Sequence, residues 1–171
     1  MAIVDYVFDD MILIYGINTR EVCMADLDMR LAIKIKALPA DVFTLLTDIP
    51  RIPELFKGFH AVRDYHGGVV RVNDTFTVVT TFMGREILNQ YTVTKLTPPT
   101  SFAWDSISPQ AKTSSQFDIE PTDEGSRIVL HVKGKPRGLV ASIGMGMVEE
   151  TLKEGIIEDL KNIRTILEST S

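Results

Sequence analysis

Cysteine, tryptophan and histidine are scarce in this sequence. Of its 171 residues, one is a cysteine (Cys23), one is a tryptophan (Trp104) and three are histidines. A single cysteine excludes an intrachain disulfide and a cysteine-cluster metal site, and it suits a reducing compartment. No histidine has a second histidine or a carboxylate at a metal-ligand spacing, and the sequence holds no Gly-rich phosphate loop. We therefore expect neither a metal site nor a cofactor.

Long apolar runs and an excess of positive charge are also missing. No stretch approaches the ~20 apolar residues that span a bilayer. The first residues lack the basic region of a signal peptide, and Asp9 and Asp10 interrupt their apolar character. These features predict a cytoplasmic protein without a transmembrane segment. The net charge of −5 resides entirely in residues 1–28, and the rest of the chain is neutral overall, which argues against nucleic-acid binding.

The C-terminal region has the clearest periodicity in the chain. Apolar residues recur there every three or four positions: Met145, Val148, Leu152, Ile156, Leu160, Ile163 and Leu167. Charged residues fill the positions between them, which predicts a long amphipathic helix over about residues 137–169. Gly144, Gly146 and Gly155 are each unfavourable inside a helix by roughly 1 kcal/mol relative to alanine. Either the helix start must be pliable or closely approached, or the regular helix begins late, near Met147.

The middle of the chain alternates with the period of two that is typical of strands. A first strand is expected at 29–36, followed by a helix that Pro39 opens and by a second short helix at 51–56. Six further strands are expected at 59–65, 74–83, 86–97, 101–107, 113–120 and 126–133. Local turns join them into an antiparallel meander. The prediction is an α+β fold, in which a curved antiparallel sheet of about seven strands surrounds the long C-terminal helix.

Residues 1–28 lie outside this pattern. Residues 11–15 favour a short strand, which Gly16 and Asn18 would close in a turn. We interpret residues 1–28 as an N-terminal extension that adds a strand to a sheet edge or to a neighbouring subunit, which makes it a candidate homodimer contact. A second interpretation places the true start of the protein at Met24 or Met29. Residues 29–171 form the expected domain, which should fold without the extension.

Strand parity divides the sheet into an inner and an outer row of side chains. We assign the bulkier row to the inner face, against the helix. Tyr91 is the only titratable side chain of that row, whereas acid–base and nucleophilic catalysis need a group that can exchange a proton near neutral pH. Binding is therefore favoured over catalysis, and no catalytic residue is assigned. The expected lining of a binding cavity is Phe56, Phe76, Val78, Thr80, Phe82, Asn89, Tyr91, Phe102, Trp104, Ser106, Phe117, Met145, Val148 and Leu152. The alternative is that these residues form a packed core.

Four segments resemble the START-like (SRPBCC) superfamily. They are the opening Ala37–Phe43 with Leu46–Asp48, the stretch from Val93 to Trp104 with its Pro-Pro pair, the turn from Glu120 to Arg127, and the C-terminal helix. The resemblance covers about residues 29–168 and is nearest to three groups: polyketide cyclases/dehydrases, coenzyme-Q-binding proteins and accessory subunits of carbon monoxide dehydrogenase. It implies a helix-grip fold with a cavity between sheet and helix. Leu55-Phe56 replaces a tryptophan found in many relatives, which would reshape the cavity mouth.

The resemblance implies binding or transport of a hydrophobic or amphipathic small molecule, such as a lipid, a quinone or a polyketide-like compound. Residues 55–59, 83–85 and 136–147 would form the mouth. One alternative is a polyketide cyclase/dehydrase-like enzyme, in which Asn89 and Tyr91 orient the substrate. Another is an accessory or assembly protein of a larger complex, with a filled interior. Lys133, Lys135 and Arg137 are either a seat for an acidic headgroup or a solvated turn.

Overall fold

The computed structural model describes residues 5–8, 11–14, 27–82, 84–137 and 145–169, and the side chains of 27–81, 84–137 and 149–169. The strands are β1 (Asp5–Phe8), β2 (Met11–Ile14), β3 (Leu27–Ile35), β4 (Phe59–Arg63), β5 (Thr75–Phe82), β6 (Arg85–Thr97), β7 (Ser101–Ile107), β8 (Ala111–Thr122) and β9 (Gly125–Pro136). The helices are α1 (Pro39–Thr47), the 3-10 turn η1 (Ile49–Arg51), α2 (Ile52–Leu55) and α3 (Met145–Ser169).

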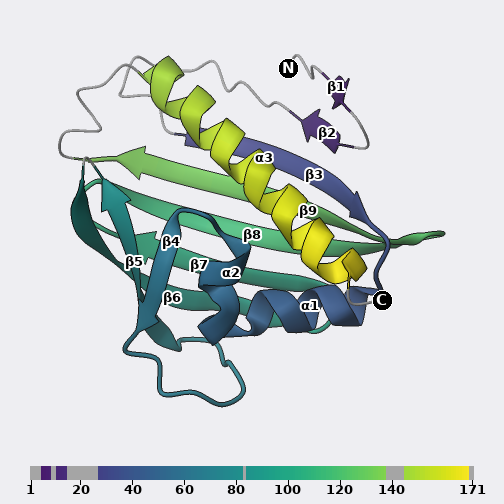
Figure 1. The fold of residues 1–171 in the computed structure, drawn as a ribbon, viewed down its shortest axis with the longest axis horizontal. Coiled ribbons are helices and arrows are strands. Elements are labelled where there is room, and N and C mark those ends of the chain that lie inside the picture. Colours follow the sequence, from purple (N-terminus) through teal and green to yellow (C-terminus); the bar gives the residue numbers. More distant parts are fainter. Residues whose placement is uncertain (1–4, 9–10, 15–26, 83, 138–144, 170–171) are drawn as a thin grey trace.

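The described strands form one antiparallel sheet in the order β1-β2-β3-β9-β8-β7-β6-β5-β4. Figure 1 shows α1, α2 and α3 on the same side of this curved sheet, with α3 running diagonally across it. The predicted α+β architecture, with seven strands from β3 to β9 and a long C-terminal helix, is confirmed. Among the described helices, none has the length and apolar character needed to cross a bilayer.

β1 and β2 add two strands to the sheet beyond β3. β2 pairs with β3 from Met11 opposite Ile33 to Ile14 opposite Arg30, so a strand lies where the sequence favoured one. β3 begins at Leu27, two residues before the expected strand. The boundary of the extension at residue 28 stays a prediction.

The inner row of side chains follows the predicted parity. The register places Phe76 opposite Tyr91, and Tyr91 opposite Ser106 on the next strand. All three side chains are at most 8% exposed. A bulge between Val93 and Lys95 inserts one extra residue into β6, so that Leu96 rather than Lys95 continues the inner row.

The C-terminal half of α3 carries the packing of this helix. Leu160 and Ile163 are fully buried, whereas Ile156 is half-buried and Leu152 is 41% exposed. The expectation that helical structure starts near Arg137 is wrong, because Arg137 is not helical and its backbone N–H donates to the carbonyl oxygen of Gln110 at 2.6 Å. The helix is described from Met145 onward, and residues 138–144 lie outside the described residues, so both explanations of the glycines stay predictions.

Gly155, in the middle of α3, faces open space. A Cβ atom added there would meet nothing within 4 Å. Close approach of another described segment therefore does not explain this glycine. Gly144 lies outside the described residues, so its expected role is not addressed by the structure.

Candidate functional site

A cluster of aromatic rings fills the inner face around Trp104. The centroid of its indole lies 5.1 to 6.1 Å from those of Phe56, Phe76, Tyr91, Phe102 and Phe117. These residues and Val78, which the sequence placed in the lining of a cavity, are all at most 8% exposed. Most of the pairs meet edge to face, a favourable aromatic geometry. The rings therefore pack against one another, as the core alternative expects.

A row of neutral hydroxyl groups crosses the sheet beside this cluster. Burial raises the pKa of the Tyr91 phenol well above its usual value, and a hydrogen bond with the Ser106 hydroxyl lowers it by a smaller amount. The hydroxyl oxygens of Ser106 and Thr113 lie 2.6 Å apart. Because Tyr91 stays protonated at neutral pH, it can donate a hydrogen bond but cannot act as a base.

The inner face is partly open to solvent at one end of the sheet. There, toward the β5–β6 turn, the side chains of the inner row are half-buried rather than sealed. We name the polar ones the polar belt, which consists of Thr80, Asn89, Ser106, Thr113 and Ser115; Ser106 is its most buried member, at 8% exposed. The belt holds hydroxyl and amide groups and no charge. It can therefore accept and donate hydrogen bonds to an uncharged polar group.

Asn89 is the belt residue with the most constrained side chain. Its Nδ2 donates to the hydroxyl of Thr80 at 2.9 Å, and it lies 3.3 Å from the carbonyl oxygens of Val78 and Ile87. All three partners belong to β5 and β6. The two strands of this hairpin therefore set the direction in which the amide points.

The face that α3 turns toward the sheet includes a lysine that the sequence analysis missed. Lys153 is half-buried and precedes Ile156 and Leu160 by three and seven residues, so it shares their face of the helix. Leu152, which the sequence placed in the lining, is 41% exposed. The helical spacing of Lys153 could have been read from the sequence. It was missed because only apolar residues were assigned to the inward face.

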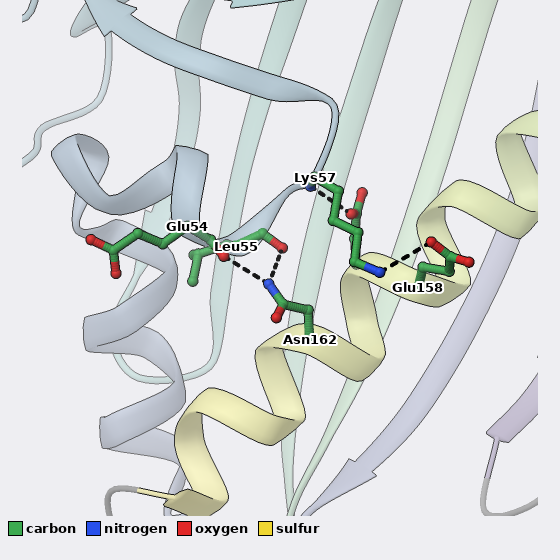
Figure 2. Close-up of polar contacts among 6 residues, drawn as sticks. Glu54, Leu55, Lys57, Glu158 and Asn162 are labelled. Atoms are coloured by element: carbon green, nitrogen blue, oxygen red, sulfur yellow. Dashed lines mark hydrogen bonds and ion pairs between the residues drawn. The ribbon is translucent and has the colours of Figure 1, made fainter.

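A polar clamp fastens the α2–β4 connection to α3 (Figure 2). Asn162 donates to the carbonyl oxygens of Glu54 and Leu55, at 2.7 and 3.1 Å. The backbone N–H of Lys57 donates to Asp159 Oδ1 at 2.9 Å, and Lys57 Nζ lies 3.2 Å from Glu158 Oε2. The clamp holds the segment that carries Phe56, and no periodicity in the sequence indicated it.

Burial raises the pKa of the Asp159 carboxyl. The hydrogen bond from the Lys57 backbone and the charge of the Lys57 side chain oppose this shift, and the charge of Glu158 adds to it. The Asp159 carboxylate thus accepts a hydrogen bond from the protein but is partly shielded from water. It faces the α2–β4 connection rather than the polar belt.

The structure leaves several expected features of the site open. The side chains of Phe82, Met145 and Val148 lie outside those described, as do Met83 and residues 138–144 of the expected mouth. Lys133 alternates with the inward Val132 and pairs with Asp28 at 3.7 Å, so it lies on the outer face. No group of three His, Cys, Asp or Glu side chains is placed to hold a metal ion among the residues with described positions.

A known family model matches most of this chain. The family model for polyketide cyclase / dehydrase and lipid transport matches residues 26–168. No protein of curated function matches the sequence significantly.

Solved structures with the same fold include two aromatase/cyclases. One is the Zhui aromatase/cyclase from Streptomyces sp. R1128, with a TM-score of 0.67 at 16% identity, covering 84% of this chain and 93% of the other. Another is the di-domain ARO/CYC StfQ from the steffimycin biosynthetic pathway, with a TM-score of 0.69 at 14% identity, covering 85% and 51%. A conserved protein from Geobacillus kaustophilus has a TM-score of 0.68 at 19% identity, covering 84% and 97%. At these identities, the similarity establishes the fold.

Proposed function

The chain belongs to the polyketide cyclase/dehydrase and lipid transport family, and on this premise we propose that it binds an uncharged or amphipathic small molecule at the polar belt. The ligand would lie between the belt and the N-terminal half of α3. Its apolar part would contact Ile156 and the border of the aromatic cluster. Its polar part would hydrogen-bond to belt residues.

The observation that carries this proposal is the partial exposure of the polar belt. Inner-face residues of a closed core are sealed, as Phe76 and Phe102 are, whereas Thr80, Asn89, Thr113 and Ser115 remain half-buried. A surface of apolar groups with a few converging neutral polar groups is the usual lining of a small-molecule site.

A cyclase-like activity is the second candidate, and the aromatase/cyclase neighbours favour it. Among the described inner-row residues from Ile87 to Val132, Tyr91 is the only one with a titratable side chain, and burial keeps its phenol protonated. Catalysis at this surface would therefore rest on positioning and on hydrogen-bond donation to a carbonyl oxygen rather than on a side-chain base. Aldol-type product formed by the wild type and lost in Tyr91→Phe would support this candidate.

The binding proposal is tested by titrating the fluorescence of Trp104, the single tryptophan. The probes are palmitate, decylubiquinone and 2-naphthol. Ser115, a belt residue, lies opposite Trp104 in the β7–β8 register. A ligand that contacts Ser115 would therefore lie close to the Trp104 indole. We expect a saturable change with at least one probe, and mass spectrometry of the purified protein should reveal a co-purifying small molecule.

Two adjacent serines on β8 supply a matched pair of variants. Ser115 belongs to the belt, whereas Ser114 is exposed on the opposite face. Ser115→Leu should weaken probe binding about tenfold, roughly 1.4 kcal/mol, because it places a larger apolar group at the site. Ser114→Leu should leave binding unchanged. Equal effects of the two variants, or no saturable response to any probe, would contradict the proposal.

A further inference from the structure

We propose that Asn89 and Thr80 together recognise a hydroxyl group on the ligand, and that this pair selects alcohols and phenols over ethers and carboxylates. The inference rests on the proposed function and specifies the ligand chemistry of the same site. Its basis is the direction of the Asn89 amide between β5 and β6.

The surroundings of Asn89 determine which end of its amide faces the ligand. Two of the three oxygens within reach of Nδ2 are the backbone carbonyls of Val78 and Ile87, which can only accept hydrogen bonds. If the amide were flipped, its own oxygen would face both carbonyl oxygens, an arrangement without a donor. The nitrogen is therefore committed to the protein.

The Oδ1 atom of Asn89 is left as a free acceptor. It makes no hydrogen bond to any described residue, whereas the nitrogen of the same amide has three candidate acceptors. The side chain is half-buried and Oδ1 is not among the sealed polar atoms of the described residues that lack a partner, so it remains reachable. An accessible acceptor of this kind calls for a donor on the ligand.

Thr80 supplies the complementary donor. Its hydroxyl oxygen accepts from Asn89 Nδ2 at 2.9 Å, and its own proton has no acceptor among the described residues. The two side chains thus present one acceptor and one donor at neighbouring positions of the inner face. A ligand hydroxyl is the smallest group that satisfies both, because it donates and accepts at the same atom.

Other ligand groups leave one of the two positions unsatisfied. An ether or a ketone accepts from Thr80 but offers no proton to Asn89 Oδ1. A carboxylate also offers no proton, and it would place its charge against that oxygen. Because an unsatisfied buried polar atom is costly, each of these groups should bind less tightly than an alcohol of the same size.

The test compares matched ligands on the wild-type protein by calorimetry. The probes are 1-decanol and decyl methyl ether, 2-naphthol and 2-methoxynaphthalene, and decanoate. We expect each hydroxyl compound to bind about three- to tenfold more tightly than its methyl ether, which corresponds to one ordinary hydrogen bond. Decanoate should bind less tightly than 1-decanol.

Two variants separate the roles of the pair. Asn89→Leu should weaken binding of the alcohols and leave the ethers unchanged, which abolishes the selectivity. Thr80→Val should weaken alcohols and ethers by the same factor, because both accept from its hydroxyl. Gln90→Leu, on the adjacent exposed residue of β6, is the matched control and should alter neither. Thermal unfolding of each variant checks that it is folded.

The outcomes distinguish this inference from the proposed function. Equal affinity of wild type for alcohol and ether overturns the inference while leaving ligand binding intact. Tighter binding of decanoate than of 1-decanol also overturns it, and would assign the polar contact to a cation such as Lys153. If none of the five probes binds, the proposed function fails together with the inference.

Discussion

The side-chain nitrogen of Asn162 lies 3.1 Å from the backbone carbonyl oxygen of Leu55, although 107 residues separate the two along the chain. The same nitrogen is 2.7 Å from the carbonyl oxygen of Glu54. α2 ends at Leu55, and the last carbonyl groups of a helix lack partners within it. Asn162 supplies the missing donors. Phe56 follows at once, with its ring centroid 5.8 Å from that of Trp104.

Replacing Asn162 should loosen this connection. We expect Asn162→Ala to lower the free energy of unfolding by about 1 kcal/mol, because the carbonyl groups of Glu54 and Leu55 lose their donor and the second of these bonds is partly buried. Urea unfolding monitored by Trp104 fluorescence measures the effect. Lys161→Ala, on the neighbouring exposed position, is the control. Equal midpoints for the two variants would show that the clamp contributes nothing.

The raised pKa of Asp159 predicts a specific pH dependence. The folded state binds the proton of this carboxyl more tightly than the unfolded state, so the resulting stabilisation is present at low pH and is lost as pH rises through the raised pKa. Asp159→Asn removes the buried charge and keeps an oxygen that can accept from the Lys57 N–H. The melting temperature of the variant minus that of the wild type should therefore be larger at pH 7 than at pH 4.

The control for this experiment is Glu154→Gln, which removes an exposed charge about one turn earlier in α3. Its difference from wild type should change little between the two pH values. A constant difference for Asp159→Asn as well would mean that the pKa of Asp159 is not raised.

Two glycine-to-alanine substitutions should have opposite signs. Gly125 has a φ of +148°, and an added Cβ would collide with the carbonyl oxygen of Ile35 and lie 2.8 Å from the Ala37 nitrogen. Gly125→Ala should destabilise the protein by roughly 2–3 kcal/mol, because the atoms it meets belong to the backbone. Gly155→Ala meets open space inside a helix and should stabilise by roughly 0.5–1 kcal/mol. Chemical denaturation of both variants measures the change in the free energy of unfolding. If the two changes had the same sign, the surroundings described for Gly125 or for Gly155 would be wrong.

Removal of residues 1–26 should leave a folded domain that self-associates. β3 pairs with β9 on one side and with β2 on the other, so the deletion turns β3 into an edge strand with unpaired backbone groups. Circular dichroism and size-exclusion chromatography, with the full chain as reference, measure folding and association. A shortened chain that is unfolded would show that β1 and β2 are integral. A folded monomer would show that the exposed edge is tolerated.

The sheet and the helices were predictable because their signals are local. Alternation along β5 to β9 identified the inner row, and the register confirms it from Phe76 to Val132. The prediction was weaker where a residue's role depends on contacts between distant segments. Trp104 was expected to line a cavity, yet five other rings surround it. Parity alone does not distinguish a lining residue from a packed one.

The sequence by itself determined the order of the elements, the face that each strand buries and the neutral character of the inner row. These properties follow from periodicity and residue type, which need no knowledge of distant neighbours. Only the tertiary structure decided that Asn162 holds the end of α2 and that the Asn89 amide points its oxygen away from the strands. Each depends on how separate segments meet in space, because hydrogen bonds and burial are set by neighbours that the chain brings together only on folding.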